Sequence, residues 1–171
     1  MNPLLGNLHP YPFEKLRQLL AQNTAAPHSN PISLSIGEPK HDTPPFIKEV
    51  LSASLDGLAA YPPTKGDAAL RETIAQWIAR RYDIPAPNPD TQILPALGSR
   101  EALFSFTQAV IDPMANAYVV CPNPFYQIYE GAAILAGAQP YYINAEAERQ
   151  FGYDWQAVPR DVWQRTRLVF V

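Results

Sequence analysis

The residue group best suited to chemistry is a short glycine-led segment, Gly98-Ser99-Arg100-Glu101. It follows a β-prone run and opens a stretch of helical periodicity, so the first amides of a helix are expected to point outward there. These amides and the helix dipole favour an anion, to which the Ser99 hydroxyl and the Arg100 guanidinium add donors and charge. The segment therefore predicts a phosphate-binding site, named the phosphate seat below. An ordinary turn with Ser99 as the helix cap is the alternative, and a P-loop pattern is absent.

A second segment, Cys121 to Tyr129, carries three aromatic rings directly after the next predicted strand. Ligands of open α/β sheets gather where the strands end, and an aromatic ring at that edge could stack on a planar cofactor. Phe125, Tyr126 and Tyr129 all suit this position, and all three equally suit ordinary packing.

Two further loops present groups that could approach a ligand. Tyr61 begins a rigid, proline-containing loop over residues 61–66 that would present its hydroxyl. Gly37, in Ser35-Ile36-Gly37-Glu38-Pro39, would permit a backbone to come close to a ligand. Taken singly, each loop is more simply explained as a surface or tight turn.

The elements that must position these residues form an N-terminal arm followed by an α/β domain. Apolar periodicity predicts helices over 11–22, from Pro44 with Thr43 as cap, over 67–82, over 98–111 and over 126–136. Strands are predicted over 32–36, 91–96, 117–121, 139–143 and 167–171. Alternating strands and helices predict a mostly parallel sheet with flanking helices. We expect residues 1–60 to form the arm and a small-domain segment, and residues 61–171 to form the first part of a large α/β domain.

Composition narrows the class of protein. The 171 residues include 47% hydrophobic and 17% charged side chains, which is typical of a globular chain. A net charge of −3 gives no reason to expect nucleic acid or an anionic membrane as a partner. The sequence shows no apolar run of about 20 residues and no signal-peptide pattern, and its single cysteine excludes an internal disulfide. We therefore expect a cytoplasmic location.

The last residues, Arg167 to Val171, form an apolar, β-prone run like a buried strand. Natural termini are usually exposed. The expectation is a truncated fold, in which this chain is the N-terminal part of a longer protein.

The four segments that could bind a ligand follow one another in a characteristic order along the chain. Ser-Ile-Gly-Glu-Pro at 35–39 precedes Tyr-Pro-Pro-Thr-Lys-Gly at 61–66, Gly-Ser-Arg-Glu-Ala-Leu at 98–103 and Pro-Phe-Tyr-Gln-Ile-Tyr-Glu-Gly at 124–131. This series resembles the class I/II aminotransferases of pyridoxal-phosphate (PLP) fold type I, over nearly the whole chain from Tyr11 onward. Segments 10–16, 34–41 and 121–131 are most similar to the bacterial N-succinyldiaminopimelate aminotransferases.

The resemblance implies a role for four of the residues above. Ser99 and Arg100 correspond to the family position that holds the PLP phosphate, and Tyr126 to the aromatic ring that stacks on the pyridine. Gln127 replaces the proline usual in that family loop, which leaves Phe125 as a second candidate for stacking.

Two more roles follow from the same resemblance. Tyr61 corresponds to a tyrosine that reaches the phosphate in the neighbouring subunit, which implies a homodimer with shared active sites. Gly37 corresponds to a glycine near the substrate carboxylate.

The implied activity is transfer of an amino group between an amino acid and a 2-oxo acid. The subfamily implies N-succinyl-LL-2,6-diaminopimelate and 2-oxoglutarate, in lysine and diaminopimelate biosynthesis. The family lysine that forms a Schiff base with PLP is expected beyond Val171, because Lys15, Lys40, Lys48 and Lys65 all lie in other contexts. The chain by itself is therefore expected to be inactive.

Other readings remain at this point. An aminotransferase of the same class could act on another acidic or N-acylated amino acid. A non-catalytic alternative is an aminotransferase-like domain that serves as the effector sensor of a transcription regulator. Another is an unrelated flavodoxin-like or nucleotide-binding α/β module that binds a different phosphate-bearing ligand at Gly98 and Ser99, which would leave the Tyr61 loop and the arm without a role.

Overall fold

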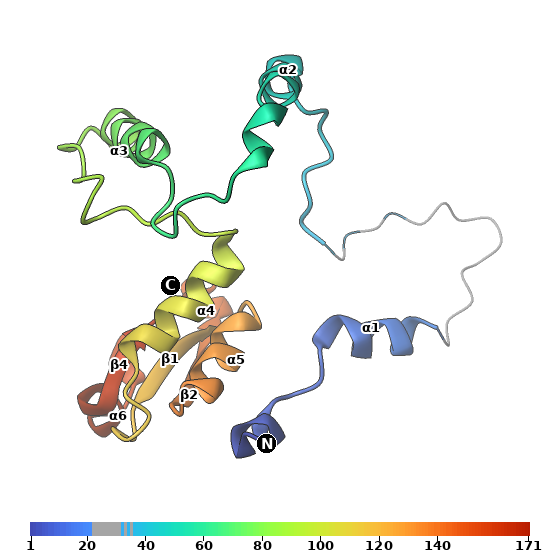
Figure 1. Cartoon of the computed structure of the whole chain (residues 1–171). Helices are drawn as coiled ribbons and strands as arrows, with labels where there is room; N and C mark the ends of the chain where they lie inside the picture. The colour runs from blue at the N-terminus through green and yellow to red at the C-terminus, as the bar shows by residue number, and fades with distance from the viewer. Residues whose placement is uncertain (22–31, 33, 35) are drawn as a thin grey trace. The chain divides into compact units, whose positions relative to one another are not determined.

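The computed structural model describes residues 1–21, 32, 34 and 36–171 (Figure 1). Backbone contacts divide the chain into two compact units. The first unit combines residues 1–24 with 96–171, and the second comprises residues 25–95. The assignment of residues 61–171 to one large domain stays a prediction.

The first unit contains a four-stranded sheet in the order β3-β2-β1-β4. Its strands are β1 (Tyr118–Asn123), β2 (Gln139–Glu146), β3 (Gly152–Tyr153) and β4 (Thr166–Val169). β1 pairs in parallel with both β2 and β4, and only the short β3 is antiparallel, against β2. The prediction of a mostly parallel sheet is confirmed.

Three α-helices flank these strands: α4 (Ser99–Val110), α5 (Ile128–Leu135) and α6 (Arg160–Arg165). α5 connects β1 to β2, α6 directly precedes β4, and α4 packs along α5 (Figure 1). Short 3-10 helices occur at Ala147–Arg149 and Trp155–Ala157. The predicted helices over 98–111 and 126–136 are therefore confirmed with slightly shorter bounds.

β1 lies at the centre of the core because its apolar run is uninterrupted. Val119, Val120 and Cys121 are fully buried, as expected for a strand covered on both faces. Successive side chains point to opposite faces, so Val119 and Cys121 pack in a cluster with Ala133 of α5. Val120 packs on the other face with Val162 of α6.

The N-terminal part of the first unit holds a 3-10 helix, η1 (Pro3–Asn7), and the helix α1 (Pro12–Leu20). Pro12 occupies the first turn of α1, where its missing N–H costs nothing. The helix predicted over 11–22 is confirmed for Pro12–Leu20. Residues 8–11, which join η1 to α1, run past α4 and α5 and contribute to the pocket described below.

The second unit consists of α2 (Pro45–Ala53), a 3-10 helix η2 (Leu55–Ala59) and α3 (Ala68–Tyr82). Asp67 caps α3 by accepting hydrogen bonds from the amides of Ala69 and Leu70. The helix predicted over 67–82 is confirmed.

A buried arginine organises the loops on either side of α3. Arg71 donates to the carbonyl oxygen of Pro89 at 2.9 Å and to that of Gly66 at 2.5 Å. Its guanidinium also pairs with Asp90 at 3.0 Å. Carbonyl oxygens and a carboxylate thus satisfy the buried cation, as burial of a charge requires, and the loop that begins at Tyr61 is tied to α3 at its Gly66 end.

Two local predictions are wrong, and one falls partly outside the described residues. Thr43 does not cap α2; Pro44 is the capping residue and no side chain bonds to the first turn, where Pro45 already lacks one of the amides that a cap would satisfy. Residues 91–96 form no strand, because a strand needs a hydrogen-bonding neighbour and none of the described strands pairs with this segment. The strand predicted over 32–36 includes residues 33 and 35, which lie outside the described residues.

Candidate functional site

The first turn of α4 forms an anion-binding arrangement. Gly98 is the capping residue, with φ 108° and ψ 162°, a backbone conformation that is essentially restricted to glycine. No described residue accepts a hydrogen bond from the amides of Ser99, Arg100 or Glu101, and the first intrahelical bond runs from Ala102 to the Gly98 carbonyl. Unpaired amides at the positive end of a twelve-residue helix are a ready-made seat for a phosphate.

The side chains next to the first turn of α4 leave its backbone amides without a hydrogen-bond partner among the described residues. The Ser99 side chain is not used as a cap, because the cap position belongs to Gly98. The carboxylate of Glu101 turns back and accepts a hydrogen bond from the amide of Leu97 at 2.7 Å. The hydroxyl of Ser99 is therefore available as an additional donor to an anion.

The aromatic loop after β1 meets the start of α4. The Nε atom of Arg100 donates to the Tyr126 hydroxyl at 2.8 Å, and the guanidinium carbon lies 5.6 Å from the centre of the Tyr126 ring. The structure thus brings Ser99, Arg100 and Tyr126 together where β1 ends, as expected for a ligand site of an open α/β sheet. Tyr126 is 42% exposed, which leaves its ring accessible to a ligand.

The two candidates for the stacking ring are placed differently. Phe125 stacks on Tyr142 of β2, with ring centres 5.3 Å apart and planes inclined by 20°. Tyr126 instead presents its hydroxyl to Arg100 and contacts the edge of Tyr129 at 6.0 Å between ring centres. Because Phe125 is already stacked on another ring, Tyr126 is the better placed of the two.

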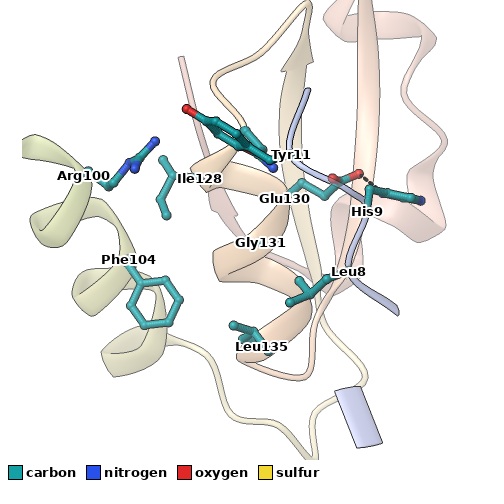
Figure 2. Close-up of a pocket in the computed structure, with 10 residues that line it drawn as sticks. Leu8, His9, Tyr11, Arg100, Phe104, Ile128, Glu130, Gly131 and Leu135 are labelled. Atoms are coloured by element: carbon teal, nitrogen blue, oxygen red, sulfur yellow. Dashed lines mark ion pairs between the residues drawn. The ribbon is translucent and has the colours of Figure 1, made fainter. Parts of the chain in front are cut away.

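A pocket of about 260 Å³ lies beside Arg100 within the first unit (Figure 2). Three parts of the chain contribute to it: the segment between η1 and α1, the helix α4, and α5 with the residue that precedes it. Its lining residues are Leu8, His9, Tyr11, Arg100, Phe104, Gln127, Ile128, Glu130, Gly131 and Leu135. A hydrogen bond to Tyr126 and a second one to Tyr11 raise the pKa of Arg100, so the guanidinium stays charged.

A buried carboxylate on α5 joins the N-terminal segment to the sheet. Glu130 is only 8% exposed, and its carboxylate lies 3.0 Å from Nδ1 of His9 (Figure 2). The Tyr142 hydroxyl donates a hydrogen bond to the same carboxylate oxygen. Burial, reinforced by the hydrogen bond and charge of Glu130, raises the pKa of Tyr142.

The buried thiol of Cys121 is also affected by Glu130. Burial, with a smaller contribution from the Glu130 charge, raises the pKa of Cys121 to about 12. Cys121 therefore stays a neutral thiol at physiological pH and serves as packing rather than as a nucleophile.

Two polar residues at the same sheet edge were not predicted from the sequence. Asn123, the last residue of β1, and Asn144, two residues before the end of β2, are register partners. The side-chain amide of Asn123 donates to the side-chain oxygen of Asn144 at 2.7 Å. The signal that could have found them was their position, since each follows a predicted strand on the side where α/β sheets bind ligands.

Tyr61 and Gly37 lie in the second unit. The Tyr61 side chain is fully exposed, and a Cβ added at Gly37 would meet nothing within 4 Å. Their expected approach to the phosphate and to the substrate carboxylate stays a prediction.

The described residues contain no group of three or more His, Cys, Asp or Glu side chains that could hold a metal ion. Across the same residues, every helix is too short or too polar to span a lipid bilayer.

Comparison with known proteins identifies the family. Residues 29–171 match the family model described as aminotransferase class I and II. The chain belongs to this family. Members of the family depend on pyridoxal phosphate, and the unpaired amides at the start of α4, with a cation and an exposed ring beside them, fit a phosphate attached to a flat aromatic ring.

Relatives and solved structures agree with this assignment. The LL-diaminopimelate aminotransferase of Dehalococcoides mccartyi is 33% identical over 169 residues, which cover 98% of this chain and 42% of that protein. The enzyme of the same name from Gloeobacter violaceus is 34% identical over 142 residues, 82% of this chain and 36% of its own length.

Among solved structures, an aminotransferase from Neisseria meningitidis superposes with a TM-score of 0.91 at 48% identity, over the whole of this chain and 44% of the other. The expectation of a PLP fold type I architecture is confirmed. The chain spans about two fifths of the length of the curated relatives that match it.

Proposed function

We propose that the whole protein is a PLP-dependent aminotransferase and that this chain supplies the phosphate seat and the stacking ring. The observation that carries the proposal is the 2.8 Å contact between Arg100 and Tyr126, which joins an open helix N-terminus to an exposed aromatic ring at one sheet edge. These two features would recognise the two parts of PLP. The helix N-terminus would bind the phosphate, and Tyr126, which is 42% exposed, would stack on the planar ring.

The roles of the residues follow from the chemistry of their atoms. The amides of Ser99 and Arg100 and the Ser99 hydroxyl would hold the phosphate at the positive end of α4. The Tyr126 ring would stack on the pyridine and keep its plane fixed. PLP, when bound, supplies an electron sink for the bonds at the substrate α-carbon.

The second unit contributes the remaining predicted contacts. Tyr61, whose hydroxyl is exposed, would reach the phosphate of a neighbouring subunit, so we propose a homodimer with shared sites. Gly37 would lie near the substrate carboxylate. The Schiff-base lysine is proposed to come from outside residues 1–171, and the location is proposed to be cytoplasmic.

The proposed amino donor is N-succinyl-LL-2,6-diaminopimelate, with 2-oxoglutarate as acceptor, in lysine biosynthesis. Support comes from the segments at 10–16, 34–41 and 121–131 and from relatives named for the unsuccinylated form, LL-diaminopimelate. Free LL-diaminopimelate is therefore the nearest alternative donor.

The test is a comparison of amino donors with the whole protein at saturating PLP. We expect N-succinyl-LL-2,6-diaminopimelate to give the largest kcat/KM with 2-oxoglutarate. A larger kcat/KM for free LL-diaminopimelate or for another acidic amino acid would change the substrate but keep the reaction. PLP binding without amino transfer from any donor would contradict the reaction and favour a non-catalytic PLP-binding protein.

A further inference from the structure

The backbone amide and the side chain of Arg100 are placed for different interactions. Its backbone amide belongs to the open first turn of α4, where no described residue accepts its hydrogen bond. Its guanidinium instead donates through Nε to the Tyr126 hydroxyl at 2.8 Å. A hydrogen bond of this length with a charged donor is among the stronger kinds, so the Nε atom of the side chain is directed at the tyrosine.

Tyr126 also makes an aromatic contact, with Tyr129. The rings of Tyr126 and Tyr129 meet edge to face, with centres 6.0 Å apart and an angle of 78°. Tyr129 in turn stacks on Phe170, with centres 4.1 Å apart and planes within 6° of parallel. Phe170 is buried in the core, so this row of rings gives Tyr126 a fixed support on one side.

Support on one side leaves the Tyr126 ring free to turn about its side-chain bonds. The Arg100 guanidinium restricts that rotation because it lies 5.6 Å from the ring centre and bonds the hydroxyl at the far end of the ring. Restricting a side chain before a ligand binds reduces the entropy lost on binding.

We propose that Arg100 is a positioning residue whose guanidinium sets the plane of the Tyr126 ring, while only its backbone amide contacts the phosphate. The inference rests on the proposed function, since the ring is useful in this way only if PLP stacks on it. It assigns the arginine side chain to the aromatic ring and not to the phosphate.

A double-mutant cycle in the whole protein tests this assignment. The variants are Arg100→Met, Tyr126→Phe and the two combined, and the quantity measured is the dissociation constant of PLP by equilibrium dialysis. Arg160→Met, which removes an exposed arginine from the start of α6, is the matched control. Circular dichroism of the bound cofactor band reports the orientation of PLP as a second readout.

We expect each single substitution to weaken PLP binding by about threefold to tenfold, the range for one hydrogen bond. The loss in the double variant should be smaller than the product of the two single losses, because either change alone already removes the hydrogen bond between Arg100 and the Tyr126 hydroxyl. The cofactor band should change in all three variants, and Arg160→Met should leave both readouts unchanged.

Two results would overturn the assignment while leaving the proposed function intact. If the two losses multiply in the double variant, the guanidinium acts on the phosphate independently of the tyrosine. If Arg100→Met binds PLP as wild type does, its side chain has no positioning role. Failure of the wild-type protein to bind PLP would overturn the proposed function and this inference together.

Discussion

The imidazole of His9 lies 3.0 Å from the carboxylate of Glu130, although 121 positions separate the two residues. Glu130 is buried on α5, and the Tyr142 hydroxyl satisfies the same oxygen from β2. This contact fixes the segment before α1 beside the pocket that also contains Arg100. Residues 8–11 therefore contribute to a pocket next to Arg100, one of the residues of the proposed cofactor site.

Glu130→Gln should loosen the N-terminal segment in the whole protein. The substitution removes the negative charge that faces His9 but retains an oxygen that can accept from Tyr142. We expect trypsin to cleave after Lys15 and Arg17 faster than in wild type, and the free energy of unfolding to fall by about 1 kcal/mol. Glu148→Gln, at an exposed position of the short helix at 147–149, is the control. Equal cleavage rates in the two variants would show that Glu130 does not hold the segment.

The Cys121 thiol should resist modification in the native protein. Burial raises its pKa to about 12 from an ordinary value of 9.0, so almost none of it is thiolate at pH 8. We expect labelling of the Cys121 peptide by iodoacetamide to be roughly a hundredfold or more slower in native than in guanidinium-unfolded protein. The labelling is measured by mass spectrometry of that peptide. Fast labelling of the native protein would refute the burial of this thiol.

The raised pKa of Cys121 also predicts a loss of stability at alkaline pH. The unfolded chain loses the thiol proton near pH 9.0, whereas the folded chain keeps it until about pH 12. The contribution of Cys121 to the free energy of unfolding is therefore complete below pH 9.0 and falls as the pH rises from there toward 12. Cys121→Ser, whose hydroxyl does not ionise in this range, should show a shallower decline in urea denaturation between these pH values.

Gly98→Ala should damage both stability and cofactor binding. A Cβ would meet no atom within 4 Å at this position, so the effect comes only from the backbone, whose φ of 108° an alanine rarely adopts. We expect a loss of about 1–3 kcal/mol in the free energy of unfolding. Gly131→Ala in α5, where there is also open space but no positive φ, should be neutral or slightly stabilising. Equal losses in the two variants would argue against backbone strain as the cause.

Residues 1–171 alone should form no covalent bond with PLP. The chain has four lysines, Lys15, Lys40, Lys48 and Lys65, and the one nearest a predicted site loop, Lys65, lies 3.8 Å from Asp90. We expect borohydride treatment with PLP to modify none of these lysines stoichiometrically, as read by mass spectrometry. Stoichiometric reduction of PLP onto Lys65, together with amino transfer by this chain, would contradict the proposed location of the lysine.

Much of the fold could be predicted from local sequence. Residues 117–121 are an uninterrupted apolar run and α3 begins after an aspartate that caps it, so β1 and α3 were both predicted close to their observed bounds. Residues 91–96 contain the apolar pair Ile93-Leu94 but have no partner among the described strands. A local apolar run indicates only the propensity of a segment, whereas a strand also depends on a distant neighbour.

In the candidate site, too, some features could be predicted from the sequence and others depend on distant neighbours. Ser99 and Tyr126 each follow a predicted strand, so their meeting at one edge could be expected from topology. His9 and Glu130 could not be predicted together, because their contact depends on the path of the segment between η1 and α1 across α5. Nor could the choice between Phe125 and Tyr126 be settled from sequence, because it depends on the ring of Tyr142 in another strand.

The most direct test of the account is the affinity of the whole protein for PLP, measured by equilibrium dialysis in wild type, Ser99→Ala and Tyr126→Ala. We expect wild type to bind PLP, Ser99→Ala to bind it about threefold to tenfold more weakly, and Tyr126→Ala to bind it at least about tenfold more weakly. Ser105→Ala, which removes an exposed hydroxyl elsewhere on α4, should bind as wild type does. Unchanged affinity in both Ser99→Ala and Tyr126→Ala would contradict the placement of the cofactor at the start of α4.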